Sequence, residues 1–320
     1  MENKQKRINY LNEYLKEKFG ERTLKICIDG NFTCPNRDGT CGIGGCVFCG
    51  ERGSGEHIHS HSSIPSNSDN LSNTLTNITQ QVQNYFSTYR AQRANKFLVY
   101  FQNFTNTYDT IENLKAKYDA ALCDERIVGL CIATRPDCLT EAIVLLLNSY
   151  QKKYYVCVEL GLQTSDDTIG ELINRGYSSE TFSKAVSLLN HYGIDVVAHI
   201  MVGLPRETFE TIKNTVQFIN HHKLQGIKIH STYIIQGTKL ADWYLTNTYT
   251  PITLEYYLDT LTYILTHISS KLVIHRISGD APKDLLLAPE WNLHKKWILN
   301  GIEKIFREKN LYQGMFYDES

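Results

Sequence analysis

The segment CPNRDGTCGIGGCVFCG, residues 34–50, decides how the rest of this 320-residue chain is interpreted. It holds four cysteines within sixteen residues, together with five glycines. An iron-sulfur cluster needs several thiolates converging on one small body, and glycines let a loop wrap tightly and turn backbone N–H groups toward the sulfurs. A cluster that acts on a substrate must keep one iron without a protein ligand, so three cysteines suffice. The segment therefore predicts an iron-sulfur centre with one cysteine to spare.

Two other kinds of site are compatible with part of this spacing. Four thiolates that include the pair Cys46 and Cys49 would serve a zinc ion, although the second, separated C-x-x-C pair of many zinc sites is missing. Cys41, Cys46 and Cys49 match the C-x4-C-x2-C spacing of electron-transfer ferredoxins. A fourth ligand placed as those proteins require is absent, and their host fold is not an alternating α/β chain.

Strand and helix patterns alternate along most of the chain. A β-rich run leads directly into the cysteines, and further strand-like runs are separated by amphipathic helical patterns. Such alternation indicates a parallel sheet with right-handed crossovers, and six strands fall short of the eight of a closed barrel. We expect an α/β fold, a partial (β/α)6 barrel with a small C-terminal α/β extension. The expected strands are 23–28, 97–102, 127–132, 155–161, 194–202 and 226–233, and the expected helices include 8–19, 110–122, 140–151, 179–192 and 207–222.

The expected organisation has three parts. Residues 1–22 form a basic helical segment, residues 23–245 form the partial barrel, and residues 246–320 form the C-terminal extension. Within the extension the pattern predicts a helix at 254–269, a short strand at 272–277 and a final basic helix at 289–309.

Bulk composition sets limits on the function. Lys and Arg together number 33 against 34 Asp and Glu, so no global field marks a nucleic-acid or membrane binder. The polar N-terminus resembles no signal peptide and no apolar run approaches membrane-spanning length, so we expect a cytoplasmic protein without membrane contact. Nine cysteines in that compartment favour metal or redox chemistry over disulfides. Five of them stand singly in apolar surroundings and are interpreted as small buried hydrophobes: Cys27, Cys123, Cys131, Cys138 and Cys157.

An ordered series of motifs resembles a known family over nearly the whole chain. The stretches are IDGNFTCPNRDGT, GGCVFC, YFQNFTNTY, ATRPDCL, VELGLQT, INRGYS, HIMVGLPRET and KIHSTYIIQGTKL. They resemble the radical S-adenosylmethionine (SAM) superfamily and, within it, the YtqA/YhcC family, relatives of the catalytic subunit of Elongator. The resemblance implies a [4Fe-4S] cluster on Cys34, Cys46 and Cys49, with Cys41 outside the triad or a substitute ligand. It also implies that SAM bound to the open iron is cleaved reductively to a 5′-deoxyadenosyl radical.

The same resemblance implies positions for SAM at the C-terminal ends of the strands, where βα loops assemble a site. Gln163 would lie near the ribose, Arg175 would meet the carboxylate, and Gly203 would lie along the adenine. A bidentate guanidinium suits a carboxylate, although a surface ion pair is the alternative for Arg175. Glu159 either contacts the ribose or is a buried structural partner. The aromatic side chain before the last cysteine and the turn after the second strand complete the set: Phe48, Gln102, Asn103, Thr105 and Asn106.

The Elongator-like resemblance points to tRNA as substrate, with remodelling of the side chain at C5 of the wobble uridine. Two basic segments near the chain ends could track phosphates, and both are also compatible with ordinary solvated helix faces. The sequence ends at Ser320 without a counterpart of Elongator's acetyltransferase domain, so we expect radical chemistry and no acetyl transfer. An electron donor such as flavodoxin or ferredoxin is implied. The alternatives are a radical enzyme on a small metabolite and a zinc-stabilised RNA-binding module. The basic residues are Lys4, Lys6, Arg7, Lys16, Lys18, Arg22 and Lys25, and then Lys295, Lys296, Lys304, Arg307 and Lys309.

Overall fold

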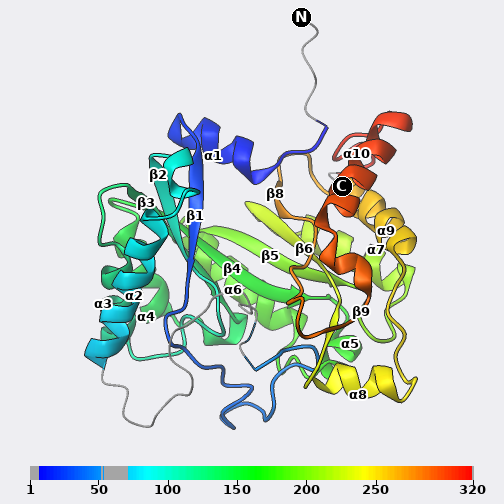
Figure 1. The fold of residues 1–320 in the computed structure, drawn as a ribbon, viewed down its shortest axis with the longest axis horizontal. Helices are drawn as coiled ribbons and strands as arrows, with labels where there is room; N and C mark the ends of the chain where they lie inside the picture. Colours follow the sequence, from blue (N-terminus) through cyan, green and yellow to red (C-terminus); the bar gives the residue numbers. More distant parts are fainter. Residues whose placement is uncertain (1–6, 52, 54–70, 319–320) are drawn as a thin grey trace, which may run out of the picture.

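The computed structural model describes residues 7–51, 53 and 71–318, and its centre is one curved parallel sheet (Figure 1). The strand order is β1-β2-β3-β4-β5-β6-β8, with every neighbouring pair parallel. The sheet forms a half-barrel, as the alternation of strand and helix patterns predicted. Its strands are β1 (Thr23–Ile28), β2 (Lys96–Phe101), β3 (Ile127–Thr134), β4 (Tyr155–Gln163), β5 (Asp195–Val202), β6 (Gly226–Ser231) and β8 (Val273–Arg276).

Helices cover the outer face of the sheet. Most of them begin where a Thr or Ser side chain accepts a hydrogen bond from the third helical N–H, so the sequence sets the N-terminus of each helix. The capping residues are Thr110, Thr140, Ser178, Thr208 and Thr253. The covering helices are α2 (Leu71–Phe86), α3 (Ile111–Ala121), α4 (Glu141–Tyr150), α6 (Ser179–His191), α7 (Phe209–Asn220) and α9 (Leu254–His267).

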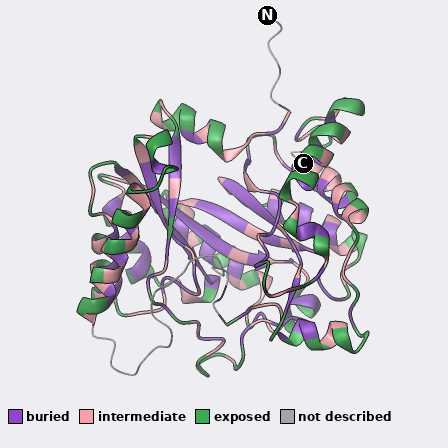
Figure 2. Cartoon of the chain, in the orientation of Figure 1, coloured by how far each residue is buried: buried purple, intermediate pink, exposed green. Residues whose placement is uncertain are grey.

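Side chains alternate between the two faces of each strand, as the period of two requires. On β1, Ile26 and Ile28 belong to the large core between sheet and helices, whereas Lys25 and Cys27 line the inside of the half-barrel. On β2, Phe101 belongs to the outer core and Tyr100 to the inner cluster. The outer face is therefore apolar, whereas the inner face carries both an apolar cluster and polar side chains, and Figure 2 shows the strands buried along most of their length.

The two ends of the chain meet at the N-terminal end of the sheet. Helix α1 (Leu11–Phe19) places Leu15, which is 2% exposed, in the apolar cluster inside the half-barrel. Arg7 donates to the carbonyl of Leu311 at 2.8 Å, and the N–H of Gln313 donates to the carbonyl of Arg7. Figure 1 shows α1 and the final helix α10 (Lys295–Glu308) at this end, away from the loop that carries the cysteines.

The C-terminal segment is continuous with the half-barrel. Strand β8 pairs with β6 and adds a seventh strand, so the expected count of six strands describes only the part before the extension. The structure also has an antiparallel pair that the sequence did not reveal, β7 (Ile234–Ile235) with β9 (Leu286–Ala288), because two or three residues carry no period. The expected final helix is divided between η3 (Glu290–Leu293) and α10. The boundaries at 22/23 and 245/246 stay predictions.

Candidate active site

The cysteine segment forms a loop after β1 that is held by its own backbone. The carbonyl of Cys34 accepts from two N–H groups, at 2.8 and 3.2 Å, and the N–H of Cys49 donates to the carbonyl of Cys46 at 2.9 Å. The stretch between the cysteines turns back through Gly44 and Gly45, whose φ angles of 81° and 77° favour glycine. Val47 anchors the far side of the loop, because its N–H donates to the carbonyl of Ile173.

Three of the four cysteines in this loop converge. Burial and the nearby Cys49 and Cys34 thiols together raise the pKa of the Cys46 thiol to about 12, against the opposing effect of Arg135. Cys41 is exposed. Among the described residues, no three His, Cys, Asp or Glu side chains stand close enough to share a single metal ion.

Two side chains directly after Cys34 approach the sulfurs. Asn36 Nδ2 lies 3.8 Å from Cys46 Sγ and donates to the carbonyl of Asn174 at 2.6 Å. Arg37 Nη1 lies 3.7 Å from Cys49 Sγ and donates to the carbonyl of Gly50 at 2.6 Å. Donors to cluster sulfurs are a recognised means of tuning such centres. The sequence analysis missed both residues, although their position beside Cys34 was a usable signal.

The turn after β2 is more buried than expected. Asn103, Thr105 and Asn106 are at most 2% exposed. Asn106 Nδ2 donates to the carbonyls of Phe101 and Ala133, and the N–H of Thr105 donates to the carbonyl of Thr33. These side chains therefore join β2, β3 and the cysteine loop. The Oδ1 atoms of Asn103 and Asn106 have no hydrogen-bond partner among the described residues, so each is a buried acceptor suited to an incoming N–H group.

Gln163 and Gly203 lie at the C-terminal ends of β4 and β5. Gln163 has a φ of 60° beside a register shift, and its Oε1 accepts from Tyr177 Oη at 3.0 Å. Gly203 has a φ of 92°, and a Cβ there would meet Ile252 at 2.9 Å. The N–H of Gly203 donates to Glu207, whose pKa burial raises to about 8. The contacts with Tyr177 and with Glu207 therefore help to hold Gln163 and Gly203 in their positive-φ backbone conformations.

Arg175 does not occupy the expected position. Its side chain is 1% exposed, and it donates to the carbonyls of Tyr177, Leu162 and Thr164 and to the carboxylate of Asp167. The guanidinium closes the loop between β4 and α5 (Asp167–Leu172), and four of its donors already have protein acceptors. We therefore assign Arg175 a structural role and withdraw the expected contact with the SAM carboxylate. The surface ion pair considered as its alternative is also wrong, because the group is buried.

Glu159 is a buried partner of cations and not an exposed ligand for ribose. It is 0% exposed on the inner face of β4, and its Oε1 accepts from Lys25 at 2.6 Å while its Oε2 pairs with Lys228. His199 Nε2 lies 2.8 Å from Oε2 and His275 Nδ1 lies 3.8 Å from Oε1. Burial alone would raise the pKa of Glu159, but Lys228 and Lys25 outweigh it and hold that pKa well below its usual value. Of the two roles expected for Glu159, these contacts fit that of a buried structural partner.

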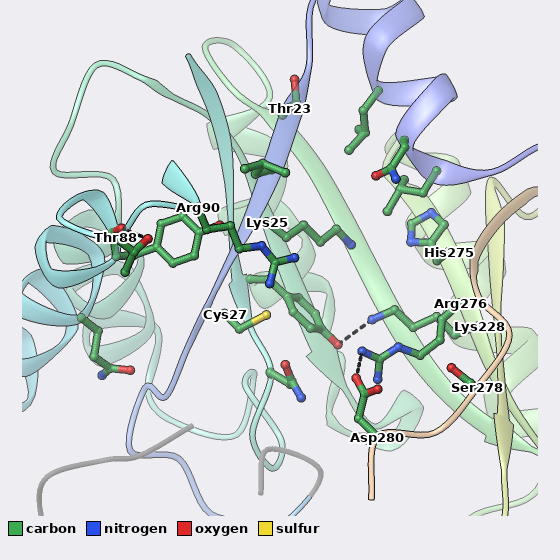
Figure 3. A pocket seen from close by; sticks show the side chains of 18 of the residues that line it. Thr23, Lys25, Cys27, Thr88, Arg90, Lys228, His275, Arg276, Ser278 and Asp280 are labelled. Carbon is green, nitrogen blue, oxygen red and sulfur yellow. Dashed lines mark hydrogen bonds and ion pairs between the residues drawn. The ribbon is translucent and has the colours of Figure 1, made fainter. Parts of the chain in front are cut away.

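A cavity of about 1450 Å³ occupies the half-barrel and opens on its flank (Figure 3). Its walls come from the inner faces of β1, β2, β5, β6 and β8 and from helices α1, α2 and α10. Gln102, which the sequence analysis placed in the SAM site, lines it together with His199 on β5 and His230 on β6. The described part of the lining is cationic, since it holds five basic side chains against one acidic side chain. The basic residues are Lys25, Arg90, Lys228, Arg276 and Lys295, and the acidic residue is Asp280.

The sequence analysis missed most of this inner lining. Lys228 stands within a strand between Ile227 and Ile229, so the period of two was the signal that could have identified it. Cys27 is exposed and lines the cavity, so its interpretation as a buried hydrophobe is wrong. Cys123 is exposed as well. For Cys131 and Cys157 the interpretation is confirmed, because both are buried.

Comparison with known proteins assigns the chain to a family. The profile of the radical SAM superfamily matches residues 36–219, and that of the radical SAM C-terminal domain matches residues 224–308. The chain belongs to the radical SAM superfamily. YtqA of Bacillus subtilis, an uncharacterised protein, is 34% identical over 98% of this chain and 94% of its own length. YhcC of Escherichia coli is 33% identical over 90% of this chain and 88% of its own length.

The Elongator-like part of the resemblance is partial. The tRNA uridine(34) acetyltransferase of Dehalococcoides mccartyi is 34% identical over 43% of this chain and 30% of its own length. Among solved structures, Elp3 of Methanocaldococcus infernus has a TM-score of 0.61 at 22% identity and covers 75% of this chain and 60% of that one. The radical SAM fold is thereby confirmed. No helix in the described part of the chain has the length and apolar character that a membrane span requires.

Membership implies two cofactors, a [4Fe-4S] cluster and SAM, and the loop fits them. The Cys34 and Cys49 thiols lie near enough to Cys46 to act on its titration. Asn36 Oδ1 is buried without a hydrogen-bond partner among the described residues, in a space where a Cβ on Gly42 would come within 2.2 Å of it. A bound ligand with an N–H or O–H group could donate a hydrogen bond to this buried acceptor.

Proposed function

We propose that this radical SAM enzyme remodels the side chain at C5 of the wobble uridine of tRNA. The observation that carries the proposal is the cationic cavity, whose lining extends from Gln102 at the end of β2 to residues of α1 and α10. A space of about 1450 Å³ is large for a small metabolite and has room for a modified base turned out of an RNA loop.

The chain's own residues divide the work around the cofactors. Cys34, Cys46 and Cys49 would hold the cluster, and Asn36 and Arg37 would donate N–H groups to its thiolates. A bound cluster with SAM supplies a 5′-deoxyadenosyl radical that abstracts a hydrogen atom from the substrate.

Around SAM, we propose that the buried Oδ1 atoms of Asn103 and Asn106 accept from its amino group. Gln163 would contact the ribose and Gly203 the adenine. Phe48, which packs against the apolar cluster beneath the cysteine loop, would cover the cofactor. Thr105, expected in the SAM-binding set, would help to fix this turn, because its N–H donates to the carbonyl of Thr33.

Local similarity to tRNA-modifying proteins supports the choice of substrate. The matched portions of the tRNA uridine(34) acetyltransferases and of Elongator complex protein 3 of Dictyostelium discoideum cover about half of this chain or less. Both helices at the rim of the cavity carry exposed cations suited to phosphates, Lys16 and Lys18 on α1 and Lys296 and Lys304 on α10. Lys4 and Lys6 of the basic N-terminal segment lie outside the described residues.

The reducing electron would come from a protein such as flavodoxin or ferredoxin. The cysteine loop stands at the opposite end of the half-barrel from α1 and α10 (Figure 1), and Ile43 on this loop is 84% exposed. An electron donor could therefore approach the cluster while tRNA occupies the flank.

Nucleoside analysis of a deletion strain tests the function. Mass spectrometry of total tRNA should show loss of one wobble-uridine modification and accumulation of its precursor. A plasmid copy of the gene should restore the modification, and the Cys49→Ala variant should not. An unchanged nucleoside profile would favour a small metabolite as substrate instead.

A further inference from the structure

We infer that the inner part of the cavity binds an anionic group of the substrate, a carboxylate or a phosphate, through Lys228, Arg276 and Ser278. Figure 3 shows Lys25 reaching into this space from β1, with Lys228 and Arg276 on the wall facing it. The inference deepens the proposed function and rests on it, because it places the substrate in this cavity.

The first argument is an excess of positive charge. Glu159 is shared by Lys25 and Lys228, and Asp280 is shared by Arg276 and Lys295, with a separation of 3.7 Å in the last pair. Each carboxylate thus neutralises one of its two cations. Arg90 adds a further positive charge to the lining. Cations held near apolar walls without an equal number of anions are costly, and an anionic ligand offsets that cost.

The histidines of the cavity do not change this balance. Burial lowers the pKa of His199 to about 4 and that of His275 to about 3, and it holds the pKa of His230 well below its usual value. All three are neutral at pH 7, so the excess charge resides on lysine and arginine. Burial also lowers the pKa of Lys228 to about 8 against the opposing effect of Glu159, which is the response expected of a cation that lacks sufficient anionic partners.

The second argument is an unused hydrogen-bond donor. Ser278 lines the cavity two residues after Arg276, is 0% exposed and has no partner for its hydroxyl among the described residues. His230 Nε2, also in the lining, is buried without a described partner. A buried hydroxyl left unpaired costs free energy, and an oxyanion would accept from it. Charge and hydrogen-bonding capacity therefore indicate the same ligand chemistry.

Cys27 supplies a reporter inside the site. Its thiol is exposed to the cavity, and although burial raises its pKa, the three cations Lys228, Lys25 and Arg276 act on it in the opposite direction. The anionic reagent iodoacetate and the neutral reagent iodoacetamide both alkylate thiolates. Because both reagents attack the same thiolate, its intrinsic reactivity affects the two rates equally. The ratio of the iodoacetate rate to the iodoacetamide rate at one cysteine therefore depends only on how strongly the surroundings favour an anion. Cys123, exposed beside Asp124, is an internal control.

The experiment measures both rates on the cluster-loaded protein at pH 7 and low salt, by peptide mass spectrometry. The iodoacetate-to-iodoacetamide ratio at Cys27 should exceed that at Cys123 by about tenfold, the equivalent of about 1.4 kcal/mol. The variants Lys228→Met and Arg276→Gln should bring the ratio toward that of Cys123, while Lys184→Met on the exposed face of α6 should leave it unchanged. Equal ratios at the two cysteines of the wild-type protein would overturn the inference.

Competition identifies the anion and separates this inference from the proposed function. Protection of Cys27 by inorganic phosphate at lower concentration than by acetate would assign the site to a phosphate, and the reverse order would assign it to a carboxylate. The assay contains no tRNA. A clear anion preference in a protein that modifies no tRNA would uphold the site and reject the proposed substrate. No preference in a protein that does modify tRNA would reject the site alone.

Discussion

The buried carboxylate of Glu159 gives the most exacting test of the structural account. Replacing it by Gln keeps the shape of the side chain and removes the negative charge shared by Lys25 and Lys228. Both ammonium groups then remain inside the half-barrel with no carboxylate between them. We therefore expect Glu159→Gln to destabilise the fold strongly, although the residue lies outside the cysteine loop.

The magnitude follows from the burial of the group. Removing one partner of a buried ion pair costs about 3–5 kcal/mol, because the remaining charge is left uncompensated. For a chain of 320 residues that loss lowers the melting temperature by on the order of 4–8 °C. Part of the cost can be relieved if Lys228 loses its proton, since burial already lowers its pKa to about 8. The loss of stability in the Glu159→Gln variant should therefore be largest below pH 8, and it should shrink as the pH rises toward the pKa of a lysine in the unfolded chain.

Thermal unfolding followed by circular dichroism, on anaerobic protein at pH 6.5 and pH 9.5, measures the effect. The matched control is Glu180→Gln, because Glu180 forms an exposed ion pair with Lys184 on α6 at 2.8 Å. That pair is expected to contribute less than about 1 kcal/mol. Similar melting temperatures for the two variants would refute the argument that Glu159 compensates buried charge.

Four further predictions concern the cluster, the loops and the cavity. Alanine at any of the three predicted cluster ligands should abolish iron and sulfide binding after anaerobic reconstitution, and Cys41→Ala should retain both. Arg175→Ala should lower the melting temperature and leave the SAM dissociation constant of the folded fraction within about threefold, whereas a large loss of SAM affinity in stable protein would restore its expected role. The affinity of the cavity for anions should fall as the pH rises through about 8, because Lys228 is then neutral; titration with inorganic phosphate at pH 7 and pH 9 measures it. Charge reversal at Lys296 and Lys304 should weaken tRNA binding about equally for all sequences and flatten its salt dependence, with no change in SAM cleavage without substrate.

Much of the fold could be predicted from the sequence because local patterns decide it. The strand at 23–28 was predicted with the bounds of β1, and the helices at 110–122 and 140–151 differ by one residue at each end from α3 and α4. The seventh strand of the sheet was predicted as a short strand at 272–277, but its partner was not. Only the tertiary structure brings Val273 beside Gly226, because the 41 residues 232–272 separate β8 from β6 along the chain.

The site was predictable only in part, for physical reasons. Cysteine spacing is a local signal, so the convergence of Cys34, Cys46 and Cys49 could be predicted. The role of Arg175 could not, since a guanidinium that closes a buried loop and one that meets a ligand look alike in sequence. The charge network around Glu159 joins β1, β4, β5, β6 and β8, and no local pattern specifies which of those residues meet.

The central claim is that this chain uses radical SAM chemistry on tRNA, and one anaerobic assay tests it most directly. Reconstituted enzyme is mixed with SAM, a chemical reductant and tRNA from the deletion strain, and 5′-deoxyadenosine and digested nucleosides are quantified together. The account predicts that tRNA stimulates 5′-deoxyadenosine formation and that the wobble uridine changes mass in proportion. Formation of 5′-deoxyadenosine at the same rate with and without tRNA, with unchanged nucleosides, would contradict it.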